Sequence, residues 1–371
     1  MGLRLDLNYL IWASVIPGVA LASRLADWTL VSGLVKCKPL PTFFTIISIS
    51  IPMREVLQFQ PIYQERVWGG RRLQTLLGRE LPPGPPIGES WEIVDRPEAQ
   101  SRVRRGRFGG STLRELIQRH SAEIMGPGWK PSAPFPLLVK WLDCSERLSL
   151  QVHPPAAVAA ELGGEPKTEN WYVAHSAPGA SLFVGLKAEV TRAGFTKAVA
   201  DGTAEECVNK VSVAAGDSVL VRSGQVHAIG AGNLILEIQQ NSDTTYRLYD
   251  WGRVGLDGKP RKLHVEESMR SILWDIGPPG LVRAAPTSGM IASCDEFSIR
   301  RVVLEKSESL KFPAGEQPRI LSVAAGDLAL SGDAPGARPL LAGDNALLPW
   351  SADLVFVAPG PAIILVTEGF I

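Results

Sequence analysis

Short apolar runs separated by glycine-containing turns dominate this chain, and this pattern predicts many short strands. From Val211 onward, such runs alternate with Gly-Asp dipeptides, and residues 136–153 are also strand-like. Helical character is confined to three stretches: residues 111–125, 154–163 and 191–209. The first of them has an apolar stripe, a cap at Ser111 or Thr112, and Glu115 in its first turn. We therefore predict a mainly β fold with a few short helices inserted.

A weak internal repeat suggests that the β-rich region contains two similar jelly-roll barrels. The hexapeptide SVAAGD occurs at residues 212–217 and again at 322–327, and another Gly-Asp turn follows at 343–344. Chance recurrence of a common turn is the alternative interpretation. His227 lies eleven residues after Gly216, whereas Leu354 lies eleven residues after Gly343. We therefore expect a polar site in the first barrel only, with a domain boundary near residues 275–290.

Charge and cysteine content exclude several classes of protein. Of the 371 residues, 38 are basic and 38 are acidic, which argues against nucleic acid or an anionic membrane surface as a partner. The four cysteines form no CxxC pair, so thiolate zinc clusters and disulfide-dense scaffolds are not expected. Only five histidines are available for imidazole chemistry.

Residues 1–52 differ from the rest of the chain. The apolar run from Leu10 to Ala22 is too short to span a bilayer comfortably. It is either the core of a secretory signal or part of a leader from a start site placed too early, with Met53 as the true start. We prefer the second interpretation and expect a cytoplasmic protein, with secretion as the alternative.

Several polar side chains in predicted strands could form a metal site. Strand alternation puts Ser149, Gln151 and His153 on one face. Glu169 and His227 each lie in another short β-run. Two imidazoles, a carboxylate and an amide oxygen suit Zn²⁺ or a similar ion. The alternative is an ordinary amphipathic strand with a solvated polar face.

The segment from Glu237 to Trp251 contains a polar tract that leads to Arg247, which aromatic residues flank. Arg247 is either a solvated loop residue or a group held over an anionic, hydroxyl-rich substrate.

Together these segments resemble type I mannose-6-phosphate isomerase, a zinc enzyme of the cupin superfamily, and especially its short bacterial form. The resemblance begins at Gln60-Pro61, covers residues 55–275 well and covers the C-terminal part loosely. It rests on six further motifs, which are ERVWGG at 65–70, IGESWE at 87–92, LQVHP at 150–154, KTE at 167–169, VHAIG at 226–230, and residues 237–251.

For the fold, the resemblance implies two cupin-like jelly-roll barrels. Residues 53–275 would form a catalytic cupin domain with helical inserts, and residues 290–371 a degenerate cupin-like barrel. Residues 1–52 match nothing in the family and would be a leader.

For the site, the resemblance implies one Zn²⁺ per chain, bound by Gln151, His153, Glu169 and His227. It assigns catalytic roles to Arg247, Lys167 and Glu237, and substrate contacts to Trp68, Glu89 and Ser149. Longer members carry a further lysine shortly after the arginine. Arg253 is the nearby cation in this chain, and whether it makes that contact stays open.

The implied reaction interconverts mannose 6-phosphate and fructose 6-phosphate by zinc-assisted proton transfer through an enediol. Lys167 or Glu237 would be the base, and Arg247 would bind phosphate or stabilise the enediolate. The expected partner is a phosphorylated hexose, with no nucleic acid and no membrane, and the protein would be a monomer or homodimer. A metal-dependent cupin oxygenase and a non-catalytic sugar-binding cupin are the alternatives.

Overall fold

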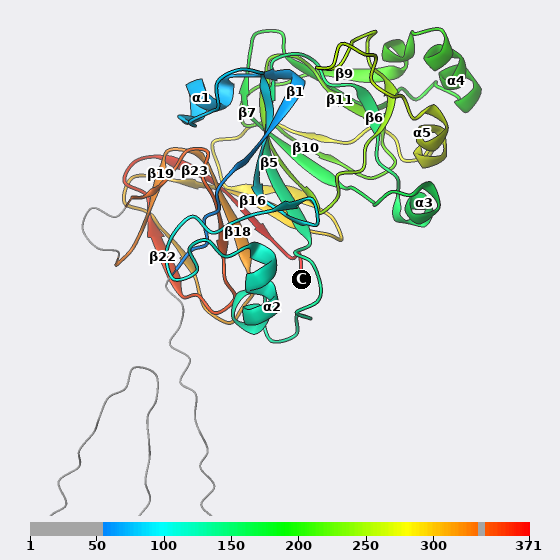
Figure 1. Ribbon diagram of the computed structural model, residues 1–371. Coiled ribbons are helices and arrows are strands. Elements are labelled where there is room, and N and C mark those ends of the chain that lie inside the picture. The colour runs from blue at the N-terminus through cyan, green and yellow to red at the C-terminus, as the bar shows by residue number, and fades with distance from the viewer. Residues whose placement is uncertain (1–54, 333–337) are drawn as a thin grey trace, which may run out of the picture. The chain divides into compact units, whose positions relative to one another are not determined.

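Antiparallel sheets are the predominant regular elements of the structure, a computed structural model that describes residues 55–332 and 338–371 (Figure 1). The mainly β prediction is confirmed. The predictions for residues 1–52 lie outside the described residues. Within the described part of the chain, none of the helices has the length and apolar character needed to cross a membrane.

The N-terminal part of the described chain forms a seven-stranded and a five-stranded sheet. The first has the order β1 (Ile62–Gly70), β2 (Ile87–Ile93), β5 (Leu137–Cys144), β12 (Asn233–Gln240), β7 (Glu169–Ser176), β10 (Ser218–Val221) and β14 (Leu281–Val282). The second has the order β13 (Tyr246–Tyr249), β6 (Leu150–Val152), β11 (His227–Ile229), β8 (Ser181–Leu186) and β9 (Val208–Ser212). Apolar side chains from both sheets, including Leu142, Trp171 and Val184, pack into one core.

The C-terminal part repeats this arrangement with fewer strands. Its five-stranded sheet has the order β15 (Gly289–Ser293), β16 (Ser298–Leu304), β23 (Ala362–Glu368), β18 (Arg319–Ala325) and β21 (Asn345–Leu348). Its four-stranded sheet has the order β17 (Ser309–Phe312), β22 (Leu354–Val357), β19 (Asp327–Leu330) and β20 (Leu340–Leu341). A small hairpin pairs β3 (Asp95–Arg96) with β4 (Ala99–Gln100).

Two Gly-Asp turns have the same geometry in the two parts of the chain. The N–H of Gly216 donates to the carbonyl of Val173 at 2.7 Å, and that of Gly343 donates to the carbonyl of Val323 at 2.8 Å. The turn at 343–344 is therefore the structural equivalent of the turn at 216–217. The two copies of the repeated hexapeptide are not structural equivalents. The first copy starts at the last residue of β9 and continues into a turn, whereas the second copy lies mainly in β18. Residues Arg54–Ile371 form one compact unit, and the domain boundary near 275–290 stays a prediction.

The helices are α1 (Arg72–Leu77), α2 (Leu113–Ile124), α3 (Ala156–Ala159), α4 (Arg192–Ala200) and α5 (Val265–Ser271). Short 3₁₀ turns at Ala160–Leu162 and Ala204–Cys207 follow α3 and α4. The predicted helix over 191–209 extends too far, because Val208 is buried and pairs with Leu186 of β8. The prediction missed α5, which lies in a region dominated by turn residues. Figure 1 shows α3, α4 and α5 along the same side as β6, β9 and β11.

Candidate active site

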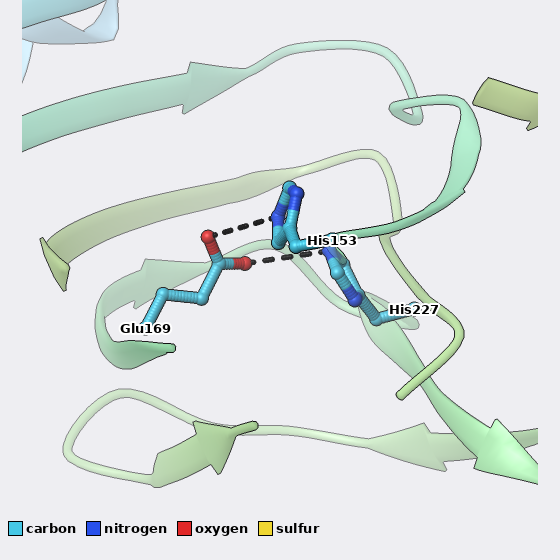
Figure 2. A group of neighbouring side chains, drawn as sticks. All are labelled: His153, Glu169 and His227. Carbon is cyan, nitrogen blue, oxygen red and sulfur yellow. Dashed lines mark ion pairs between the residues drawn. The ribbon is translucent and has the colours of Figure 1, made fainter. Parts of the chain in front are cut away.

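Three side chains that are distant in the sequence meet inside the first pair of sheets (Figure 2). His153, Glu169 and His227 are fully buried, and each offers a ligand atom within 4.8 Å of the others. Glu169 Oε2 lies 3.3 Å from His153 Nε2, and Glu169 Oε1 lies 3.4 Å from His227 Nε2. The predicted convergence of these residues is therefore present in the structure.

Strand pairing explains why these residues meet. Gln151 in β6 is directly opposite His227 in β11, so their side chains lie on the same face of the sheet. His153 follows two residues later and thus points to that face as well. Glu169 is the first residue of β7, where it pairs with Val221 and Gln239 of the neighbouring strands.

The electrostatic environment keeps both imidazoles neutral and the carboxylate ionised. Burial lowers the pKa of His153 to about 3, and the charge of Lys167 acts in the same direction. Burial also lowers the pKa of His227. Burial alone would raise the pKa of Glu169, but the Lys167 ammonium, 2.6 Å away, acts together with His153 and His227 to reverse this effect and hold the pKa well below its usual range. Neutral imidazoles and an ionised carboxylate are the forms that bind a metal.

The free atoms of the cluster fit a divalent cation. His227 donates from Nδ1 to the carbonyl of Gln225 at 2.8 Å, so Nε2 is left as a ligand. Both buried oxygens of Glu169 lack a hydrogen bond of normal geometry among the described residues. The amide nitrogen of Gln151 lies 3.3 Å from His227 Nε2, and rotating this amide by 180° would point its oxygen there. This donor set suits Zn²⁺.

A pocket of 360 Å³ adjoins this cluster. Seven residues that the sequence singled out line it: Trp68, Glu89, Ser149, Gln151, Lys167, Glu237 and Arg247. The remaining lining residues were not predicted from the sequence, and they are Arg66, Lys140, Leu142, Leu148, Asp243, Thr245 and Arg261. Lys140 could have been found from the sequence, because it is the one lysine inside the apolar run of β5. Arg261, and not Arg253, is the second loop arginine that lines the pocket.

Two buried carboxylates in the pocket have different environments. Glu237 lies 3.0 Å from Lys140 and 3.7 Å from Lys167, yet burial and then the charge of Glu169 raise its pKa. Burial would also raise the pKa of Glu89, but Lys140, Arg66 and a hydrogen bond from Trp91 reverse this effect and hold it at about 2. Glu89 is therefore firmly ionised, whereas Glu237 is the carboxylate better suited to accept a proton.

The equivalent positions in the C-terminal sheets carry no such donor set. Phe312 pairs with Leu354 there, as Gln151 pairs with His227, and Arg319 begins β18 as Glu169 begins β7. The Arg319 guanidinium lies 5.4 Å from the centre of the Phe312 ring. Among the described residues, the C-terminal counterparts of Gln151, His227 and Glu169 thus offer no donor set for a metal.

Comparisons with known proteins find a matching family model and several similar chains. Residues 56–178 match the family model of the type I phosphomannose isomerase catalytic domain. The chain is 41% identical to mannose-6-phosphate isomerase of Streptococcus mutans over 218 residues, which are 58% of this chain and 67% of that protein. It is 37% identical to mannose-6-phosphate isomerase ManA of Bacillus subtilis over 305 residues, which are 80% of this chain and 93% of that protein. The crystal structure of the mannose 6-phosphate isomerase from Bacillus subtilis aligns with a TM-score of 0.73 at 29% identity, covering 85% of this chain and 100% of that chain.

Proposed function

Because this chain belongs to the type I mannose-6-phosphate isomerase family, we propose that its pocket interconverts mannose 6-phosphate and fructose 6-phosphate through an enediol. The observation that carries the proposal is the convergence of seven predicted residues around one pocket beside the His153, Glu169 and His227 cluster. Family membership favours the isomerase over the oxygenase and the non-catalytic module considered above. A charged sugar phosphate does not cross a bilayer unaided, so the proposal includes the expected cytoplasmic location.

In the proposed mechanism, Gln151, His153, Glu169 and His227 would hold one Zn²⁺ per chain. When bound, this ion would supply a Lewis acid that polarises the carbonyl of the sugar. The buried ion pair between Lys167 and Glu169 fixes the lysine at the wall of the pocket.

We assign the base to Glu237. Its raised pKa makes it a better proton acceptor than Glu89, and Lys140 and Lys167 hold one of its oxygens while Trp171 Nε1 donates to the other at 2.9 Å. Glu237 would take the proton from C2 of the mannose form and return it to C1. Lys167 is less suited to this step, because its ammonium is engaged by Glu169 and Glu237.

Arg247 is the cation that would bind the phosphate or the enediolate. Its Nη1 donates to the carbonyl of Lys262 at 2.8 Å. Its buried Nε has no acceptor among the described residues, so this N–H is available to an anionic ligand.

A coupled assay for fructose 6-phosphate, with and without a chelator, tests the function. We expect activity that the chelator abolishes and added zinc restores. His153→Ala should lose both bound zinc and activity while its circular dichroism stays native. Arg247→Ala should keep its zinc but lose most of its turnover. Full activity in metal-free His153→Ala protein would remove the metal from the mechanism, and an unchanged rate in Arg247→Ala would refute the role of Arg247.

A further inference from the structure

Three arginines gather where β13 ends, and one carboxylate lies among them. Asp250 accepts hydrogen bonds from Arg253 Nη2 at 2.8 Å, from Arg261 Nε at 2.7 Å and from Arg261 Nη2 at 2.5 Å. Arg247 is the third arginine. Burial and then the charge of Arg261 lower its pKa, so its guanidinium lies within the electrostatic field of Arg261. Glu146 also lies 3.8 Å from Arg253 Nη1. Three positive charges against two negative charges still leave a positive excess, which suits an anionic ligand.

The two arginines bound by Asp250 point to different surroundings. Arg253 also donates from Nη1 to the carbonyl of Arg147 at 2.7 Å, and it does not line the pocket. Arg261 does line the pocket. Its hydrogen bonds within residues 55–332 and 338–371 run from Nε and Nη2 to Asp250, which leaves Nη1 for a ligand.

No regular element holds Arg261. It lies in the irregular segment between β13 and α5, and its neighbours Pro260 and Lys262 are exposed. The two parallel hydrogen bonds to Asp250 are therefore what fixes the plane of its guanidinium. The same segment also holds Arg247, because the carbonyl of Lys262 accepts from Arg247 Nη1. Arg247 and Arg261 are thus fixed relative to each other at one wall of the pocket.

We propose that Arg261 binds the phosphate group of the substrate and that Asp250, which does not line the pocket, is the positioning residue that orients it. This inference rests on the proposed function, since it assigns the phosphate of the same substrate to a particular wall of the pocket. It also assigns the role of the second cation after Arg247 to Arg261. Arg253 would then serve only as a second hydrogen-bond donor to Asp250.

The test is a double-mutant cycle on the zinc-loaded enzyme. A charged hydrogen bond contributes about 1.5–3 kcal/mol, so Arg261→Gln should raise KM for mannose 6-phosphate about tenfold or more, with a much smaller change in kcat. Asp250→Asn should also raise KM for mannose 6-phosphate. In the Arg261→Gln background, Asp250→Asn should add little, because it acts through the arginine. Competitive inhibition by inorganic phosphate should weaken in parallel.

Asp217→Asn is the matched control. Asp217 is also buried and also binds an arginine, Arg283, at 2.8 Å, but it does not line the pocket. Its substitution should lower stability without changing KM. An unchanged KM and unchanged phosphate inhibition in Arg261→Gln would overturn the inference, and this variant removes only a loop side chain, so it should fold. Fully additive effects in the double variant would refute the positioning role of Asp250. Absence of isomerase activity in the wild type would instead contradict the proposed function, and calorimetry with inorganic phosphate would still test Arg261.

Discussion

At the scale of single residues, the pocket shows how neighbours decide the state of a buried carboxyl group. Glu89 and Glu237 are both almost inaccessible to solvent. The charge of Lys140 stabilises the ionised form of Glu89, and so do hydrogen bonds from Arg66 at 2.9 Å and from Trp91 at 2.7 Å. Glu237 lies in the field of Glu169, which opposes a second negative charge. The same residue type therefore serves as a fixed anion in one position and as a proton acceptor in the other.

The depressed pKa of Glu89 predicts an acid-dependent contribution to stability. The difference between 4.5 and about 2 corresponds to about 3 kcal/mol of folding free energy. Because the pKa is lower in the folded state, this stability is present above pH 4.5 and is lost as the pH falls toward 2. Glu89→Gln should thus be less stable than wild type at pH 7, and the deficit should shrink between about pH 5 and pH 3. Urea unfolding of both proteins at pH 7 and at pH 3 measures the deficit in stability, and a deficit independent of pH would contradict the assignment.

Sequence reasoning found the residues whose chemistry is visible in short motifs. His153, Glu169 and His227 each lie in a recognisable segment, and strand alternation puts Gln151 on the face of His153. Arg261 could not be found in this way, because only the fold of an irregular segment brings it back to Asp250, eleven residues earlier. Arg253 is nearer to Arg247 in sequence, yet its guanidinium is occupied by Asp250 and a backbone carbonyl.

At the scale of elements, local signals and tertiary contacts have separable effects. Helix α2 follows its local signals: Thr112 accepts from the N–H of Glu115, and Glu115 accepts in return from the N–H of Thr112. The helix predicted over 191–209 ends at Ala200, because Gly202, two residues later, adopts a left-handed φ of 75°. Val208, at the far end of the predicted span, is buried and pairs with β8. The apolar periodicity alone therefore misplaces this boundary.

The cap of α2 gives a prediction at this scale. The sequence allowed either Ser111 or Thr112 as the cap, and the structure selects Thr112. Thr112→Ala should lower the free energy of unfolding by about 1 kcal/mol, because it leaves an N–H of the first turn without its acceptor. Ser111→Ala is the control and should be close to neutral. Urea denaturation of both variants measures the difference, and equal losses would contradict the capping assignment.

At the scale of the whole molecule, the C-terminal sheets contact the strands that carry the pocket. The carbonyl of Gly343 accepts hydrogen bonds from Trp141 of β5 at 3.0 Å and from Arg79 at 2.6 Å. Lys140, the neighbour of Trp141, lines the pocket. The C-terminal Gly-Asp turn therefore contacts the strand behind a wall of the site.

Arg79 lies at the centre of this contact, and its substitution tests how much the contact contributes to stability. It lies 3.0 Å from Glu92 and 3.8 Å from Asp344, and all three side chains are buried. Removing one partner of a buried ion pair leaves an uncompensated charge and costs about 3–5 kcal/mol. Arg79→Met should lower the free energy of unfolding by this amount, and adding Glu92→Gln should recover part of it.

Because residues Arg54–Ile371 form one compact unit, the loss should appear as a shift of a single urea transition in tryptophan fluorescence. Arg107→Met is the control, since its ion pair with Glu123 is exposed and contributes about 1 kcal/mol or less. Two separate transitions in Arg79→Met would show that the two parts of the molecule fold independently. Such a result would also remove the reason to expect the C-terminal sheets to affect the position of Lys140.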